Sequence, residues 1–344
     1  MNFTSTFTRI VFFSITILLT SNNLYSQSEN LSSINELDKK ALFSFTIMSD
    51  NKGDEVKKKP FKRMVDWMIE SDKKFVIGLG DHVKKKKTPK KTKKKNKFLD
   101  FLIENDWWKH NFYPNIADGE NEFYGNGQGD WGAGYPLLNH VNMSKRKNTV
   151  IRENKCEYYS KIEVENDYIV HLIQLHYSDT PDNEIEAFNQ STRDYLVETI
   201  SSIDKRKDKD IIIVAAHSKD GIWIDKLNKK NRKIVMEKAD LLLSATTHIF
   251  NIFDIEGYYS YAEEKENELR KTNRTGALCI NTGAITHANG FCPNGYVEVH
   301  VLASPFRLVV QYINAEEKKR QLQPDGYSVV KEIGGKIYYP SFSK

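Results

Sequence analysis

The stretch FVIGLGDHV, residues 75–83, has the pattern of a buried strand that stops at a Gly-Asp pair. A strand that ends in this way holds a carboxylate at the carboxyl edge of a sheet, where the active sites of layered α/β folds lie. Three other apolar runs close on an Asp or a His: FSFTIMSD on Asp50, DIIIVAAHS on His217 and ADLLLSATTH on His248. Packing alone does not require such residues at four strand ends. The pattern therefore predicts a site built from Asp50, Asp81, His217 and His248.

Strand and helix signals alternate along the rest of the chain. Apolar residues recur at helical spacing in FKRMVDWMIES (61–71), and FLDFLIENDWWKHNFY (98–113) continues as a second helix. Residues 156–179 predict a hairpin, and residues 190–203 and 226–238 predict further helices. Crossover patterns mixed with hairpins, in two successive halves, predict an α/β (α+β) fold in which two sheets pack together with helices outside.

Composition and charge limit the possible architectures and partners of this protein. The chain has 344 residues, of which 39% are hydrophobic, so it can bury a full core in one large domain or two small ones. The net charge of +5 is misleading, because ten lysines lie in the lysine-rich loop, residues 83–97, and the remainder is mildly acidic. This loop is either a solvated insertion or a cationic rim that attracts phosphorylated or sulfated polyanions. It lacks the interleaved aromatic residues that stack on bases, so we expect no specific nucleic-acid recognition.

The amino terminus has the features of a signal peptide. Arg9 precedes the apolar residues 10–19, and a polar, Ser-containing exit follows. The apolar run is shorter than the ~20 residues that cross a bilayer, so we expect export to the periplasm or the medium, without stable membrane insertion after cleavage. An uncleaved membrane anchor is the alternative. The predicted organisation is a signal peptide (1–26), a linker (27–40), the folded domain (41–314) and a C-terminal tail (315–344).

Export makes the three cysteines relevant. Cys279 and Cys292 flank a short segment and could close a small loop in an oxidising compartment, whereas Cys156 has no obvious mate. Three buried free thiols are the alternative, and the separation of the Cα atoms decides between them.

The order of the strand-end residues resembles that of the calcineurin-like metallophosphoesterases. Their signature runs D-x-H, G-D, G-N-H-[DE], H and G-H-x-H. It is matched in part by Asp50, Gly80-Asp81, Gly119–Glu122, His217 and Ala245–His248. The resemblance implies a four-layer αββα sandwich with a two-metal site at the carboxyl ends of the strands. A mixture of imidazole and carboxylate suits manganese, zinc or iron.

The resemblance also implies roles for the residues. Asp81 would bridge two cations, Asp50 and His248 would bind one of them, and His217 the other. Two such cations, about 3.5 to 4 Å apart, hold a phosphoester and activate water. The implied reaction is hydrolysis of a phosphate mono- or diester in a phosphorylated small molecule or a polyanionic substrate.

The chain departs from the signature at several positions. Lys52 replaces the His of D-x-H, and Thr246 replaces the first His of G-H-x-H. In the third motif, Glu120 stands at the position of the metal-binding Asn, and Asn121 stands where the proton-donating His belongs. A slip of one residue would instead make Asn121 the ligand.

Three kinds of site are compatible with these departures. The protein could hold two metals, with water or Glu120 filling the gaps, or one metal, with the Lys52 ammonium gripping an oxyanion. It could also hold none and act as a non-catalytic protein that binds an anion or a partner. A different alternative is a sugar- or nucleotide-binding module that uses Trp107-Trp108 and the Tyr124-containing loop.

Overall fold

The computed structural model of this chain describes residues 33–83, 96–117, 135–153, 155–176, 188–218, 224, 226–253, 276–286, 292–323, 327–338 and 340. These residues form two seven-stranded sheets. The first sheet has the order β14 (Ile337–Tyr338), β13 (Ser328–Glu332), β12 (Arg307–Asn314), β11 (Gly295–Leu302), β1 (Phe43–Met48), β2 (Val76–Gly78) and β3 (Phe112–Pro114). The second has the order β4 (Thr149–Ile151), β5 (Tyr158–Glu163), β6 (Ile169–Leu175), β7 (Asp210–Ala216), β8 (Leu241–Ser244), β10 (Leu278–Thr282) and β9 (Phe250–Phe253).

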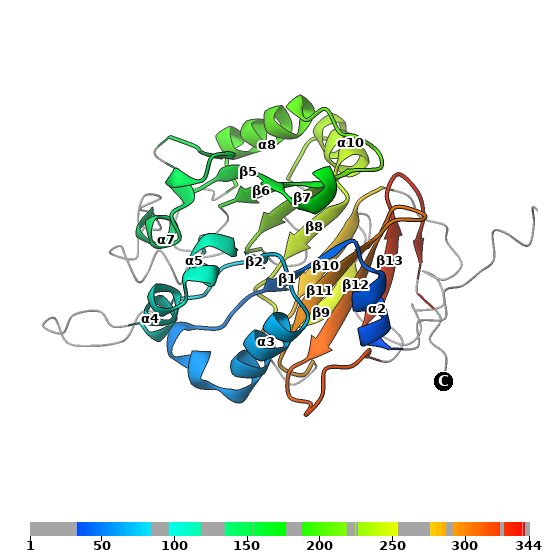
Figure 1. Cartoon of the computed structure of the whole chain (residues 1–344). Coiled ribbons are helices and arrows are strands. Elements are labelled where there is room, and N and C mark those ends of the chain that lie inside the picture. The colour runs from blue at the N-terminus through cyan, green and yellow to red at the C-terminus, as the bar shows by residue number, and fades with distance from the viewer. Residues whose placement is uncertain are drawn as a thin grey trace, which may run out of the picture.

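Helices lie on the outer faces of the two sheets (Figure 1). The α-helices are α2 (Ile34–Lys40), α3 (Lys59–Glu70), α4 (Lys97–Glu104), α5 (Asp106–Asn111), α7 (Tyr135–His140), α8 (Gln190–Ser202) and α10 (Lys229–Lys238). Three short 3-10 turns are η1 (Gly53–Lys57), η2 (Met143–Lys145) and η3 (Glu165–Asp167).

Alternation along the strands divides the apolar side chains between two layers. In β7, Ile211 and Ile213 join the core between the sheets, whereas Ile212 and Val214 join a second core under α8 and α10. In β1, Phe45 belongs to the inter-sheet core. Because successive strand residues point to opposite faces, one continuous apolar run can serve both layers. The four-layer αββα sandwich predicted from the sequence is confirmed.

Parallel strands meet at the edge that carries the predicted site. β1 pairs in parallel with β2, and β2 with β3, while β6, β7, β8 and β10 form a parallel set in the second sheet. Their carboxyl ends therefore lie at one edge of each sheet. β1 also pairs antiparallel with β11, from Phe43 opposite Val301 to Ile47 opposite Val297, so it lies in the middle of the first sheet.

Most predicted elements are present. Helix α3 occupies the first predicted helix, and β5 and β6 form the predicted hairpin. The second predicted helix, 98–113, is instead two helices and a strand. Asn105 takes an extended conformation (φ −118°, ψ 93°) that ends α4 and begins α5, and Phe112 begins β3.

The predicted linker and tail both contribute to the folded structure. Residues 34–40 of the linker form α2, which Ser33 caps and which buries Leu37 against Leu302 and Val330. The tail supplies β13 and β14, which extend the first sheet beyond β12. Both segments are short and weakly periodic, so their burial depends on strands far away in the sequence.

Cys156, Cys279 and Cys292 are buried thiols that form no disulfide with one another, which is the second of the two alternatives. Among the described residues, the helices lack the length and apolar character needed to cross a bilayer. The predicted signal peptide and residues 84–95 of the lysine-rich loop lie outside the described residues.

Candidate metal centre

Two neighbouring strand-end turns form the base of the candidate site. Asp50 and Asp81 both have left-handed backbone conformations, with φ of 54° and 55°. The turns are held in register because Asp50 N–H donates to the Gly80 carbonyl (3.1 Å) and Lys52 N–H donates to the Asp81 carbonyl (3.0 Å). These bonds fix the directions in which the Asp50, Lys52 and Asp81 side chains leave the backbone.

Gly80 allows the second sheet to approach the first at this edge. Its φ is +95°, and a Cβ at this position would lie 2.5 Å from the Cβ of Ala117 and 3.0 Å from Nδ1 of His217. A side chain would therefore clash with the end of β7. The Gly-Asp pair that marked this stretch in the sequence thus has two separate purposes, close packing at Gly80 and a carboxylate at Asp81.

Asp50, Asp81 and His217 converge across the two sheets. One ligand atom from each lies within 4.8 Å of the other two. Asp50 is fully buried, and its Oδ2 atom has no hydrogen-bond partner among the described residues. A buried carboxylate oxygen without a partner is costly, and a bound cation would compensate it.

The ring of His217 is oriented for binding a cation. Its Nδ1 donates to the carbonyl oxygen of Leu79 (2.6 Å), so Nε2 carries the lone pair. Nε2 lies 4.0 Å from Oδ1 of Asp81. A backbone carbonyl that fixes the tautomer of an imidazole is a common support for metal-ligating histidines.

His248 and Lys52 complete the other side of the cluster. Nε2 of His248 lies 2.9 Å from Oδ1 of Asp50. Nζ of Lys52 lies 3.5 Å from the same nitrogen and 3.8 Å from Oδ2 of Asp81. Burial alone would raise the pKa of Asp50, but the hydrogen bond with His248 and electrostatic interactions with His217, His248 and Lys52 lower it below its usual range. Asp50 is therefore an anion at neutral pH.

His82 supports the turn and is not available as a ligand. It is fully buried, Nδ1 contacts Oδ1 of Asn51, and Nε2 accepts from the Gly80 N–H (3.1 Å). Burial lowers its pKa to about 3, so the ring is neutral. Thr246, two residues after the end of β8, has a left-handed backbone (φ 85°) and a buried hydroxyl oxygen without a partner among the described residues.

The structure adds Asn115, which the sequence reasoning missed. It follows β3 and is buried, and its Nδ2 donates to the Leu175 carbonyl (2.7 Å) and to Oε1 of Gln174 (2.9 Å). This amide ties the third parallel strand of the first sheet to β6 of the second. Its position directly after the strand FYP was the available signal. The predicted site residues Glu120 and Asn121 lie outside the described residues.

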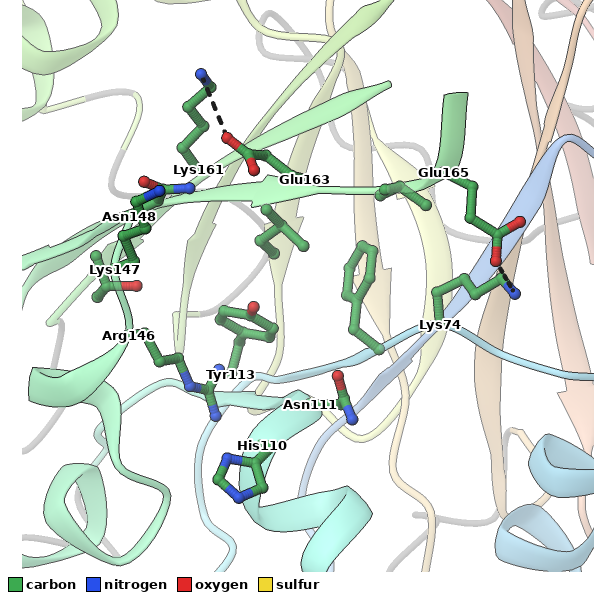
Figure 2. A pocket seen from close by; sticks show the side chains of 14 residues that line it. Lys74, His110, Asn111, Tyr113, Arg146, Lys147, Asn148, Lys161, Glu163 and Glu165 are labelled. Carbon is green, nitrogen blue, oxygen red and sulfur yellow. Dashed lines mark hydrogen bonds and ion pairs between the residues drawn. The ribbon is translucent and has the colours of Figure 1, made fainter. Parts of the chain in front are cut away.

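A separate cavity of about 410 Å³ lies at the amino ends of β2 and β3, which are the opposite ends of these strands from the candidate metal centre (Figure 2). Lys74 and Asn111, which precede these strands, line it together with Arg146. Nη2 of Arg146 donates to the carbonyls of Lys109, Phe112 and Val141, and the guanidinium lies 4.3 Å from the centre of the Tyr113 ring. None of the predicted ligands lines this cavity, so it is distinct from the candidate metal centre.

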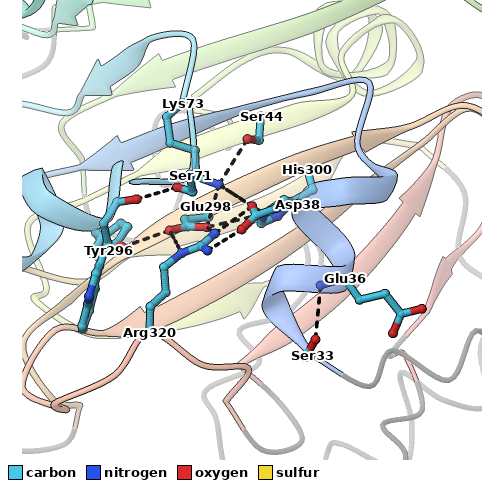
Figure 3. A network of polar contacts seen from close by, with 11 residues as sticks. Ser33, Glu36, Asp38, Ser44, Ser71, Lys73, Tyr296, Glu298, His300 and Arg320 are labelled. Carbon is cyan, nitrogen blue, oxygen red and sulfur yellow. Dashed lines mark hydrogen bonds and ion pairs between the residues drawn. The ribbon is translucent and has the colours of Figure 1, made fainter. Parts of the chain in front are cut away.

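A second group of possible metal ligands lies on the outer face of the first sheet under α2 (Figure 3). Asp38, Glu298 and His300 also offer atoms within 4.8 Å of one another. Lys73 lies 3.0 Å from both carboxylates, and Arg320 contacts both as well. Two cations already balance two anions here, so this group is an internal ion cluster and has no unpaired charge for a metal.

The donor set at the strand ends does fit a transition-metal ion. It combines carboxylate oxygens with an imidazole nitrogen whose tautomer is fixed, as manganese, zinc and iron sites do. The Oδ2 atom of Asp50, which is buried and has no hydrogen-bond partner in the part of the chain that the structure describes, supports this fit.

No protein-family model and no curated protein matches this sequence. Several solved structures match this chain at low sequence identity. A dimetal phosphatase from Danio rerio is 9% identical, with a TM-score of 0.47 over 88% of this chain and 100% of that chain. GAP50, the anchor in the inner membrane complex of Plasmodium, is 12% identical, with a TM-score of 0.45 over 89% and 90%. A 5'-nucleotidase precursor from Thermus thermophilus is 11% identical, with a TM-score of 0.38 over 86% of this chain and 56% of that chain.

Proposed function

We infer that this chain is a divergent calcineurin-like metallophosphoesterase that is exported and hydrolyses a phosphate mono- or diester. The observation that carries this proposal is the convergence of Asp50, Asp81 and His217, within 4.8 Å of one another, at the carboxyl edges of the two sheets. Its expected substrates are phosphorylated small molecules or polyanions.

The residues that would hold the metal are Asp50, Asp81, His217 and His248, with Glu120 or Asn121 added from the third motif. A transition metal bound there, manganese, zinc or iron, supplies a water of lowered pKa and withdraws charge from the phosphoryl oxygens. The protein holds Asp81 between the two sides of the cluster and keeps Asp50 dry and ionised.

Lys52 and Asn121 are the proposed catalytic residues beside the metal ligands. The Lys52 side chain is only 17% exposed and its ammonium faces the same carboxylate as His217 does. A partly buried ammonium favours a bound oxyanion, which it can grip as a point charge. Asn121 occupies the position from which a family member's His would donate a proton, and an amide cannot donate as a general acid. We therefore expect slower hydrolysis than a site with that His would give.

Elemental analysis and an ester panel test the proposal together. Protein purified and reloaded with manganese, zinc or iron should retain metal and hydrolyse p-nitrophenyl phosphate or bis(p-nitrophenyl) phosphate. Asp81→Ala should lose both properties, because its carboxylate contacts both sides of the cluster. Asp66→Ala, a change at an exposed Asp of α3, is the matched control. Wild-type protein with no more metal than Asp81→Ala would overturn the metallophosphoesterase proposal.

A second candidate function is a non-catalytic anion- or partner-binding protein with the same fold. Lys52 and Thr246 favour it, because each stands where a ligating imidazole would be expected. Metal retention without hydrolysis of either ester, combined with binding of inorganic phosphate, would support this alternative.

A further inference from the structure

The carboxylate of Asp81 lies between an imidazole on one side and an ammonium group on the other. Its Oδ1 atom faces Nε2 of His217 at 4.0 Å, and its Oδ2 atom faces Nζ of Lys52 at 3.8 Å. A carboxylate that bridges two metal ions has the same arrangement, with one ion at each oxygen. Here one of the two places adjoins an imidazole, and the other adjoins an ammonium group.

The backbone conformation of Lys52 fixes its position beside Oδ2 of Asp81. Its N–H donates to the Asp81 carbonyl, and its φ of 40° belongs to the left-handed region. The following residue, Gly53, has a φ of +64°, and its N–H donates to the His82 carbonyl (2.8 Å). The side chain therefore leaves a constrained turn and extends toward His248, where Nζ lies 3.5 Å from Nε2.

The donors on the two sides of Asp81 are unequal. On one side, His217 presents a lone pair, and Oδ2 of Asp50 has no partner among the described residues. On the other side, Oδ1 of Asp50 is engaged by His248, and the ammonium of Lys52 stands next to that imidazole. A divalent ion on this second side would lie against a positive charge at contact distance, which is strongly unfavourable in a partly buried site.

We propose that the centre binds a single divalent transition-metal ion, on the side formed by Asp50 Oδ2, Asp81 and His217, and that the Lys52 ammonium takes the place of a second ion. The proposal rests on the phosphoesterase function inferred above and specifies how its substrate is held. One phosphoryl oxygen would bind the metal and another would bind Lys52. Among the described residues, the two aspartates, Lys52 and one divalent ion leave one positive charge, which matches a phosphodiester monoanion or partly neutralises a monoester dianion.

Metal stoichiometry tests the number of ions without any activity measurement. After loading with manganese or zinc and removal of loosely bound metal, wild-type protein should hold one ion per chain. Lys52→His combined with Thr246→His should hold two, because the ammonium is removed and two imidazoles are added. Two ions in the wild type would overturn the single-ion proposal and leave the phosphoesterase function intact. No ion in the wild type would instead overturn the function itself.

Phosphate binding tests the part assigned to Lys52. In metal-loaded protein, Lys52→Met should weaken the binding of inorganic phosphate at least tenfold in titration calorimetry while one ion per chain remains bound. Lys52→Arg should retain both properties, because it keeps the charge. Lys57→Met, at an exposed lysine of η1, is the matched control and should behave as the wild type.

Circular dichroism and thermal unfolding of each variant separate a folding defect from a binding defect. If Lys52→Met is folded and binds phosphate as tightly as Lys57→Met, Lys52 does not contact the anion and the proposal is wrong. If Lys52→Arg loses phosphate binding but remains folded, a fixed positive charge is not what the site requires, and the proposal is again wrong.

Discussion

Nζ of Lys73 lies 3.0 Å from Oε2 of Glu298, and both side chains are completely buried. Lys73 comes shortly before β2, whereas Glu298 is in β11. The pair lies in the ion cluster on the outer face of the first sheet, where Asp38 of α2 and Arg320 also contact it. The cluster therefore joins segments from both ends of the chain around a completely buried Lys73–Glu298 pair.

Lys73→Met should destabilise the protein strongly. The substitution leaves Glu298 buried with less compensation, and breaking a buried pair in this way costs about 3–5 kcal/mol. Lys74→Met is the matched control, because Lys74 pairs with Asp72 and Glu165 at the surface, where a pair contributes about 0–1 kcal/mol. Urea denaturation measures the free energy of unfolding of both variants. Equal losses in the two variants would show that the buried cluster does not stabilise the fold.

The free energy of unfolding should fall as the pH is lowered from 7 to 4. Burial, reinforced by the charge of Lys73, lowers the pKa of His300 to about 4, so the folded state binds fewer protons than the unfolded chain in this range. His300→Gln keeps a donor toward Asp38 and removes this titration, so its stability should fall less, by an amount on the order of 2 kcal/mol. Urea titrations of both proteins at pH 7, 5.5 and 4 give the comparison.

Below pH 4, protonation of the carboxylates in the ion cluster should cause a further fall in the free energy of unfolding. Burial by itself would raise the pKa of Glu298, but the charges of Lys73 and Arg320 lower it to about 2. Stability contributed by a carboxylate with a lowered pKa is present above its unfolded value and is lost as the pH falls through the folded one. His82 and His176, whose pKa values burial lowers from 6.5 to about 3, act in the same direction, and their effect already begins near pH 6.5. A pH-independent stability between 7 and 3 would contradict this reading of the cluster.

Gly80→Ala should disturb the metal centre as well as the fold. Its Cβ would clash with Ala117 and with the ring of His217, so we expect a loss of about 2–4 kcal/mol together with weaker metal binding. Gly334→Ala is a control with a similar backbone, since φ is +69° and a Cβ there meets nothing within 4 Å. That variant should lose only about 1 kcal/mol, with unchanged metal content. Thermal unfolding and elemental analysis of the two variants distinguish steric from conformational effects.

Arg146→Met should destabilise the edge of the sandwich near the cavity in Figure 2. The guanidinium donates to three backbone carbonyls and stacks on Tyr113, and losing these contacts should cost about 2–3 kcal/mol. The neighbouring Lys145, which is exposed, provides the control Lys145→Met. If both variants unfold at the same urea concentration, the three carbonyls are satisfied without Arg146.

The exported protein should begin near Gln27. The apolar run after Arg9 and its polar exit are the basis for this expectation. Intact-mass measurement of protein recovered from the periplasm or the medium gives the new amino terminus. A mass that includes residues 1–26, found in a membrane fraction, would show that the segment is an uncleaved anchor.

The sequence was most informative where a local pattern determines structure. Asp50, Asp81 and His217 could be predicted as neighbours because each follows an apolar strand, and parallel strands bring such ends to one edge. The contact between Lys52 and His248, 196 residues apart, could not be predicted. It depends on how the two sheets approach each other, and Gly80 sets that distance only in three dimensions.

The segments whose helix and strands the sequence does not predict have few apolar residues of their own. Helix α2 buries only Ile34 and Leu37, too few to produce a helical period in a seven-residue segment. Strand β13 is buried by its pairing with β12, which the sequence of β13 alone does not specify. In both cases distant partners, rather than local propensity, decide the structure.

The antiparallel pairing of β1 with β11 has a consequence for synthesis and for the proposed export. The central strand of the first sheet comes from residues 43–48, and its neighbour on one side comes from residues 295–302, so the ribosome has made most of the chain before the two can meet. Contacts this far apart in sequence form slowly. If the chain is exported as proposed, the late arrival of β11 would keep the first sheet open during translocation, and the sandwich would close after the chain has crossed the membrane.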